Sequence, residues 1–229
     1  MKKLILLVVV MSSLSITAQT KTELQKHFEG YYKQMKKQGD IQGVINAMTH
    51  LDVIAPTQAR KDTLAYIYVS EGRNMEALNT IGIEKSGTDS DLNTEIKAIA
   101  LNALGERARA LEFYKVLYAK KPTPSIAYEI ADLMLQTGDL AGAKEKVEYG
   151  LANVTDEMRR TYYETQQPYQ TSLKAGLLYL KAIVTYSEDK DANQEIALAT
   201  LNRALAIDPN FNMAKISKEA LLTRKKGTD

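Results

Sequence analysis

Four glycines recur along the chain at a constant spacing of 33 residues: Gly39, Gly72, Gly105 and Gly138. The positions around them repeat as well. Seven residues before each glycine stands Tyr32, Ala65, Ala98 or Ala131, and five residues after it stands Val44, Ala77, Ala110 or Ala143. A fixed period of this length is typical of an array of similar supersecondary units, and it constrains the fold more than any other feature of the sequence.

The repeated unit predicts two helices joined by a tight turn at the glycine. Glycine adopts the left-handed conformation that ends many helices without a steric penalty. The flanking stretches carry helical periodicity, as in residues 59–71, where apolar side chains fall on neighbouring turns. The alanines stand where two helices must approach closely. Because one helix pair cannot bury both of its apolar faces, successive pairs are expected to stack.

These residues resemble the tetratricopeptide repeat, whose pattern has a small residue in the first helix, Gly-Asp at the turn, an alanine in the second helix and a closing proline. Ala131, Gly138-Asp139 and Ala143 match in one copy; a second copy matches through Ala98, Gly105, Ala110 and Pro122. The resemblance implies an all-α fold, a right-handed α-solenoid of about five helix-turn-helix repeats with a C-terminal capping helix. The alternatives are a non-repetitive helical bundle and ankyrin repeats, whose Thr-Pro-Leu-His signature is missing.

The repeats place the elements of a single domain over residues 19–229. We expect repeats at about 25–57, 58–90, 91–123, 124–153 and 171–209, and a capping helix over 210–226. From Ala143 to its equivalent Ala197 is 54 residues, so about 21 are inserted. Part of the insertion is the segment 154–170, where we expect a short helix over 156–166 that ends before Pro168. The polar stretch 187–193 is expected to lengthen a turn.

The first eighteen residues predict a secretory signal peptide. Lys2 and Lys3 precede an apolar run over Leu4–Met11, and small residues lead to a cleavage site after Ala18. The alternatives are that this segment is an uncleaved membrane anchor or the first helix of the fold. The chain has no cysteine, so it is not expected to be a lipoprotein. We expect export to the periplasm of a Gram-negative bacterium, with no integral membrane span in the mature chain.

Charge and chemistry exclude several classes of function. Removing residues 1–18 removes two lysines and no acid, which leaves 28 Lys+Arg against 28 Asp+Glu, and this neutral balance excludes nucleic acid as the main partner. The two histidines, His27 and His50, lack metal-ligand spacing, and the sequence has no nucleophile elbow or phosphate loop. We therefore expect no enzyme, no metal and no cofactor.

The resemblance also implies a binding surface, because the first helices of this family line a concave groove that holds a peptide. Carried over by position, the groove residues are Lys33, Lys37, Asp62, Tyr66, Asn102, Tyr128, Asp132, Gln136 and Tyr179. Glu29 and Asp62 stand where a carboxylate-binding subgroup needs cations, so that subgroup does not fit. In the insertion, Arg159, Arg160, Tyr162 and Tyr163 are residue types enriched at interaction hot spots; they either contact a partner or pack on the array.

The implied function is a non-enzymatic protein–protein interaction scaffold or adaptor of the bacterial cell envelope, which binds a partner peptide or helix in the concave groove. Two alternatives stay open. One is a structural subunit of a stable envelope assembly. The other is an enzyme or ligand-binding module built around the insertion at 154–170. The oligomeric state is not determined by these patterns.

Overall fold

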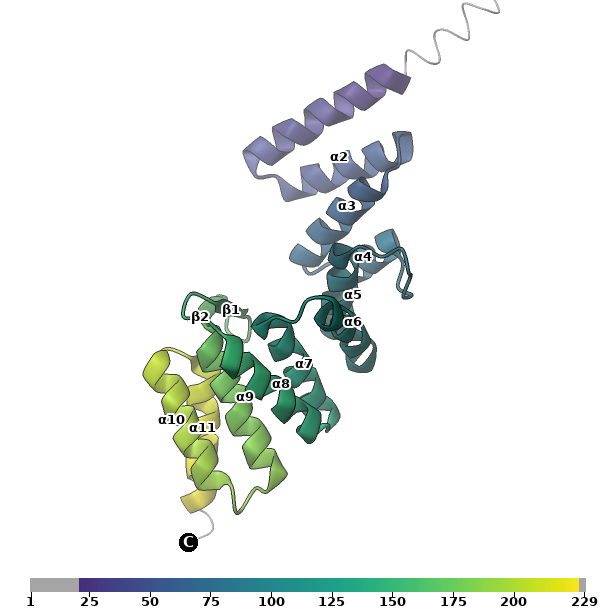
Figure 1. Ribbon diagram of the computed structural model, residues 1–229. Coiled ribbons are helices and arrows are strands. Elements are labelled where there is room, and N and C mark those ends of the chain that lie inside the picture. The colour runs from purple at the N-terminus through teal and green to yellow at the C-terminus, as the bar shows by residue number, and fades with distance from the viewer. Residues whose placement is uncertain (1–20, 227–229) are drawn as a thin grey trace, which may run out of the picture. The chain divides into compact units, whose positions relative to one another are not determined.

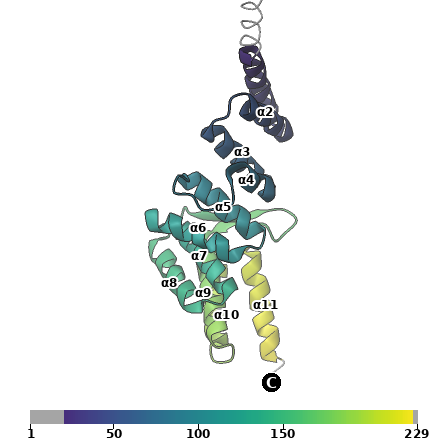
Figure 2. The ribbon, with the colours of Figure 1, turned by 90° about the vertical axis from the view of Figure 1, so that its right-hand side faces the viewer.

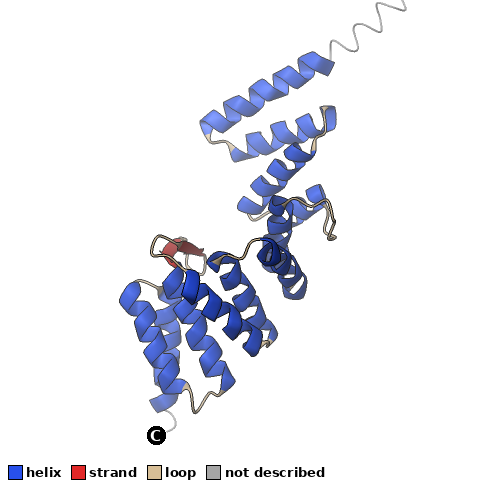
Figure 3. Cartoon of the chain, in the orientation of Figure 1, coloured by secondary structure: helices blue, strands red, loops and turns tan. Residues whose placement is uncertain are grey.

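The computed structural model describes residues 21–226. The predicted signal peptide at 1–18 and its cleavage site lie outside the described residues. The described part of the chain consists of helices apart from one short two-stranded hairpin (Figure 3). None of the helices within this part is both long and apolar enough to cross a membrane.

The chain divides into two compact units, Met1–Leu104 and Gly105–Asp229. The boundary lies in the turn between helices α5 and α6, inside the third predicted repeat. In unit 1 the described helices are residues 21–38, α2 (Ile41–Ile54), α3 (Gln58–Ser70), α4 (Asn74–Ile81) and α5 (Asp91–Ala103). Consecutive helices from α2 to α5 pack against one another, and α5 also contacts α3 (Figure 1).

Unit 2 holds the remaining elements. Its helices are α6 (Arg107–Lys120), α7 (Pro124–Thr137), α8 (Leu140–Asn153), α9 (Leu173–Glu188), α10 (Gln194–Ile207) and α11 (Asn212–Lys226). Between α8 and α9 come strands β1 (Arg159–Tyr162) and β2 (Tyr169–Ser172). Helix α9 contacts α7, α8 and α10, and α11 packs against α10 as Figure 2 shows. Helix α11 occupies most of the segment 210–226 where a capping helix was expected. The turn between α9 and α10 spans residues 189–193, while Ser187 and Glu188 belong to the end of α9.

The periodic residues have the roles that their spacing predicts. All four glycines have a positive φ, from 71° at Gly72 to 87° at Gly138, so each occupies the backbone conformation that disfavours other residues. The alanines at the helix contacts, from Ala65 to Ala143, have no exposed surface. Side-chain caps begin several helices: Asp40 accepts from the Gly43 amide at 2.8 Å, and Asp139 accepts from the Gly142 amide at 2.9 Å.

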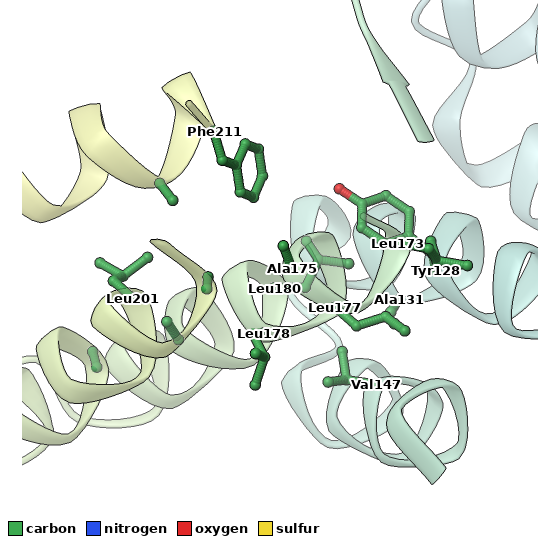
Figure 4. Close-up of a cluster of buried hydrophobic side chains, with 14 of the residues drawn as sticks. Tyr128, Ala131, Val147, Leu173, Ala175, Leu177, Leu178, Leu180, Leu201 and Phe211 are labelled. Atoms are coloured by element: carbon green, nitrogen blue, oxygen red, sulfur yellow. The ribbon is translucent and has the colours of Figure 1, made fainter. Parts of the chain in front are cut away.

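The main hydrophobic core lies in unit 2, where α7, α8, α9 and α10 meet (Figure 4). Leu177, Leu201 and Phe211 have no exposed surface, and Leu173 and Leu180 are almost as fully buried. Burial of one such side chain contributes about 1.5–3 kcal/mol relative to its exposure to water. The clusters described in unit 1 are smaller; one lies around Val44 and Leu64, and another lies around Ala65 and Ile96. Helix α9 is therefore the centre of the better-packed unit.

A buried ion pair holds the loop between α4 and α5. Lys97 of α5 is 1% exposed, and its Nζ donates to both carboxylate oxygens of Asp89 at 2.8 and 2.7 Å. The same ammonium donates to the Glu84 carbonyl at 2.7 Å. A buried lysine is tolerated only when its charge is paired and hydrogen-bonded in this way. The loop over residues 82–90 is thus fixed to α5 by one side chain.

The predicted helix over 156–166 is wrong, because residues 159–172 form an antiparallel hairpin. Arg159 pairs with Ser172, and Tyr162 pairs with Tyr169. In a strand, residues two apart share a face, so Arg160 and Tyr162 both reach the same surface of the unit. A helix would turn these two side chains about 200° apart. Their common contacts with α7 therefore favour the strand over an isolated short helix, which is marginal in water.

Candidate partner-binding surface

The groove residues predicted in unit 1 lie on three separate helices. Lys33 and Lys37 are exposed on the helix over 21–38, and Asn102 is partly exposed on α5. On α3, Tyr66 is 54% exposed, and Asp62 accepts a hydrogen bond from Gln58 at 2.7 Å. Asp62 and Tyr66 stand one turn apart on the same side of α3. These residues offer a polar, tyrosine-bearing surface to solvent.

The predicted residues on α7 form a connected polar row. Gln136 Nε2 donates to Asp132 Oδ2 at 2.8 Å, and Arg107 Nε at the start of α6 donates to Gln136 Oε1 at 2.6 Å. Asp132 is half-buried, whereas Gln136 is exposed. The row runs along one stripe of α7, because residues four apart lie one above the other on a helix.

Tyr128, one turn before Asp132, lies in the core and not on the surface where a groove residue is expected. Its side chain is 2% exposed, and its hydroxyl lies 2.9 Å from the hydroxyl of Tyr162 on β1. Figure 4 shows Tyr128 beside the core residues Leu173 and Ala131. A helix made only of the repeat pattern leaves this ring open to solvent, but the inserted hairpin covers it. The placement of Tyr128 is therefore corrected by a tertiary contact.

Space for the two tyrosines comes from Gly176 on α9. A Cβ atom at this position would lie 2.7 Å from the Tyr162 hydroxyl and 3.2 Å from Tyr128 Cε2. Both distances are too short for ordinary packing. Gly176 allows the two tyrosine side chains to approach the helix closely. The turn glycines have a different role, because they adopt a positive φ.

Arg160 is the residue that joins the hairpin to α7. Its guanidinium forms an ion pair with Glu129, and its Cζ lies 4.0 Å from the centre of the Tyr128 ring and 5.3 Å from that of Tyr162. Cation–π contacts of this kind strengthen when the pair is desolvated. Burial by itself lowers the pKa of Arg160, but Glu129, with smaller contributions from Tyr128 and Tyr162, outweighs it and raises that pKa. The cation is permanent.

We call these residues the tyrosine–arginine cluster; it consists of Tyr128, Glu129, Asp132, Gln136, Arg160, Tyr162 and Tyr179. Tyr179 of α9 contributes its half-buried ring, which packs edge-on against Phe211 at 5.5 Å between ring centres, and it forms a hydrogen bond with Ser217 of α11. Four of the seven were predicted as groove residues, and Arg160 and Tyr162 were singled out as insertion residue types that are enriched at interaction hot spots. Glu129 and its pairing with Arg160 were not predicted, because this contact joins residues 31 positions apart.

The remaining insertion residues point away from the cluster. Tyr163 is 76% exposed, and residues 163–168 form an exposed tip. Arg159 is also exposed and donates to the carbonyl of Met158 at 3.2 Å. The insertion residues were expected either to pack on the array or to contact a partner. Tyr162 packs on the array, whereas Arg159 and Tyr163 are exposed and accessible to a partner.

The acidic groups of the cluster hold their protons more tightly than usual. Burial raises the pKa of Tyr162 to about 12 and raises that of Tyr128 well above its ordinary value, so both hydroxyls stay protonated at neutral pH. Burial also raises the pKa of Asp132, although Arg160, Gln136 and Arg107 act in the opposite direction. The ionised Asp132 is therefore incompletely solvated in the folded chain.

The histidines and acids elsewhere do not assemble a second site. His27 and His50 both pack against Phe28, at 5.4 and 4.2 Å between ring centres. Within residues 21–226, no three histidine, aspartate or glutamate side chains converge as a metal site requires.

Comparisons with known proteins identify the fold. No protein-family model and no curated protein matches the chain. Solved structures do. A tetratricopeptide repeat protein from Parabacteroides merdae ATCC 43184 superposes with a TM-score of 0.65 at 16% identity, covering 87% of this chain and 72% of that one. YrrB, a TPR protein, gives a TM-score of 0.62 at 14% identity, covering 84% and 90%.

A third structure extends the similarity to a thermophile. TTC0263, a TPR protein of Thermus thermophilus, gives a TM-score of 0.51 at 14% identity, covering 87% of this chain and 99% of that one. The chain therefore has the tetratricopeptide-repeat fold, an all-α helical solenoid, as the resemblance implied. This fold is typical of scaffolds for protein–protein interaction.

Proposed function

We propose that the protein is a non-enzymatic scaffold that binds a protein or peptide partner along the surface of α7 and α9. The supporting observation is the tyrosine–arginine cluster, in which a half-buried acid, Asp132, stands beside aromatic rings and an exposed amide, Gln136. Tyrosine and arginine supply large contact areas in interfaces. The exposed amide of Gln136 and the half-buried side chains of Asp132, Arg160 and Tyr179 thus combine contact area with hydrogen-bonding groups, while Tyr128 and Tyr162 are buried.

A peptide is the partner that this arrangement favours. YrrB, which has the same fold, is described as having an unusual peptide-binding site. In the present chain, Asp132 gains most from a cationic group on the peptide, since a partner charge would offset the incomplete solvation of its carboxylate. Asp62 and Tyr66 of unit 1 offer similar chemistry on a surface of their own. Catalysis is not part of the proposal.

We further propose export to the bacterial cell envelope, in the periplasm of a Gram-negative cell. The basis is the charged head, apolar run and small-residue exit over residues 1–18. Expression in such a host, followed by cell fractionation and N-terminal sequencing, should place the protein in the periplasmic fraction with residue 19 as its first residue. Recovery from the cytosol with an intact N-terminus would contradict export.

Site-specific photocrosslinking in the native host tests the binding surface. Probes are placed at Gln136 and Tyr66, and matched control probes at two exposed positions outside the proposed surface, Glu145 and Val53, whose exposures are 73% and 80%. We expect Gln136 to trap a defined partner band that the control on α8 does not trap. Equal or stronger trapping at Glu145 would exclude this surface.

The oligomeric state separates a scaffold from a subunit of a fixed assembly. A scaffold of this type is expected to elute as a monomer, with the mass of one chain by light scattering. Self-association, or recovery with a partner in constant ratio at every purification step, would favour the structural subunit.

A further inference from the structure

Helix α9 carries a second face, opposite to the one that contacts the tyrosine–arginine cluster. Gly176 and Tyr179 face the hairpin, Phe211 and α11. Lys174, Leu178 and Lys181 are spaced by four and three residues, so they share a stripe roughly opposite on the helix. This stripe lines a pocket of about 390 Å³ together with residues of α8 and α10. We call it the α9–α10 groove.

The interior of the α9–α10 groove is apolar. Leu178 forms its buried base, Leu151 of α8 is partly exposed, and Ile207 at the end of α10 is 43% exposed. The volume suits one large side chain of a partner. Covering Ile207 and Leu151 would remove apolar surface from water, which favours an apolar occupant.

The rim of the groove is cationic. Lys174, Lys181 and Arg203 line it, and none of the residues recorded as lining it is acidic. Lys174 has a distant ion-pair partner, Asp156 at 3.8 Å, whose side chain is 89% exposed. Within residues 21–226, Lys181 and Arg203 have no carboxylate within 4.0 Å that forms a salt bridge. Unpaired cations around an apolar floor select a ligand of opposite charge.

We propose that the α9–α10 groove binds an acidic segment of a partner protein. One large apolar side chain of the segment enters between α9 and α10, while flanking carboxylates pair with Lys181 and Arg203. Charge complementarity argues for this occupant, because the apolar floor attracts any hydrophobic group but the rim repels a cationic one. The groove lies on a different face of α9 from the proposed peptide surface, so the two sites are independent.

Fluorescence anisotropy with the purified protein tests the proposal. The probe is a fluorescein-labelled peptide in which a Leu-Phe pair is flanked by two acidic residues on each side. One matched peptide carries lysines in place of the acids, and another carries serines in place of the Leu-Phe pair. We expect saturable binding of the first peptide only, weakened by raising the salt concentration because exposed charges are screened.

Variants of the protein separate this site from general charge attraction. Lys181→Glu with Arg203→Glu should weaken binding of the acidic peptide by at least about tenfold. Lys190→Glu with Lys215→Glu makes the same change in net charge at exposed positions outside the groove and should change binding less than about twofold. Ile207→Ser, at a partly exposed position, tests the apolar contribution. Circular dichroism confirms that each variant is folded.

Three results with the peptides and the variants would overturn the proposal. They are the absence of saturable binding, equal weakening by both double variants, and tight binding of the lysine peptide. Binding to vesicles of anionic lipid without binding to the acidic peptide would also overturn it, in favour of a membrane surface. Because none of these variants alters the tyrosine–arginine cluster, crosslinking at Gln136 reports separately on the proposed function.

Discussion

Asp132 of the candidate surface destabilises the isolated protein when its carboxyl group is ionised, because the group is incompletely solvated. Burial raises the pKa of its carboxyl group, so the folded chain favours the neutral form. The ordinary pKa of this group is 3.8, and the folded chain holds the proton more tightly than the unfolded chain does. Perturbed carboxyl groups of this kind cluster at functional sites. An ion-pairing partner would remove the penalty that the folded chain carries on its own.

Replacement of Asp132 by asparagine is therefore expected to stabilise the isolated protein at pH 7. The gain should shrink as the pH falls through the raised pKa of the folded state, and it should vanish below pH 3.8, where the carboxyl group becomes neutral in the unfolded state as well. Urea denaturation at pH 7 and pH 4 measures the difference. Asp62→Asn, which keeps an acceptor for the amide four residues earlier, is the control. Destabilisation by Asp132→Asn at pH 7 would contradict this account.

The hydroxyl pair of Tyr128 and Tyr162 gives a second test at the residue scale. Removing either hydroxyl leaves the other buried without its partner at 2.9 Å, which costs about 1–2 kcal/mol of unfolding free energy. The double variant Tyr128→Phe/Tyr162→Phe removes both groups and should cost less than the sum of the single changes. Urea denaturation measures all three, and the exposed Tyr163→Phe should change stability by less than about 0.5 kcal/mol.

Alkaline unfolding follows from the same pair. Burial raises the pKa of Tyr162 from 10.0 to about 12, so the folded state holds this proton more tightly than the unfolded state. The resulting stability is fully present below pH 10 and is lost as the pH rises through about 12. Tyr162→Phe should flatten the fall in unfolding free energy between these values. An unchanged slope in that variant would show that Tyr162 ionises freely in the folded chain.

At the scale of elements, the hairpin joins α7 through alternate side chains of β1. Successive strand residues point to opposite faces, so Arg160 contacts Glu129 and Tyr128 while Arg159 is exposed. Arg160→Ala should destabilise the protein by about 1–3 kcal/mol, since it removes the ion pair with the half-buried Glu129 and the cation–π contact with Tyr128. Arg159→Ala should cost less than about 0.5 kcal/mol. Equal effects in urea denaturation would place the two side chains in equivalent surroundings.

The turns between paired helices give a prediction about backbone conformation alone. Gly138 has φ 87°, and nothing lies within 4 Å of a Cβ built there, so Gly138→Ala should cost about 1–2 kcal/mol through its left-handed conformation. Gly30 lies inside a helix, also with free space around it, and Gly30→Ala should instead stabilise by about 0.5–1 kcal/mol. Thermal unfolding measures both signs.

At the scale of the whole molecule, the two units differ in how their cores are built. Among the described residues, unit 2 buries an extended cluster centred on α9, whereas the clusters around Val44 and Ala65 in unit 1 are small. Hydrogen exchange on the full chain should therefore be slowest for amides of α9 and α10 and faster for those of α2 and α3. The fragment 105–229 should unfold cooperatively by itself, because the cluster lies wholly within it. Faster exchange in α9 than in α3 would contradict this order.

The repeat architecture could be predicted from the sequence, because the residues that it requires are determined by local structure. A turn glycine such as Gly138 is required by its own positive φ. An alanine such as Ala131 is required by the close approach of a helix nearby in the sequence. Both requirements recur every 33 residues, so the period predicted helix pairs that stack on one another. The resemblance then indicated Asp132, Gln136 and Tyr179, which the structure places in one cluster.

Tertiary structure alone decided the hairpin, the burial of Tyr128 and the pairing of Arg160 with Glu129. These contacts join residues 31 and 34 positions apart, and neither partner carries a local pattern that points to the other. The local sequence of residues 156–166 is compatible with a short helix and with a strand. The strand is favoured because it directs both Arg160 and Tyr162 onto α7. The free energy of these contacts is available only once α7 and α9 are packed.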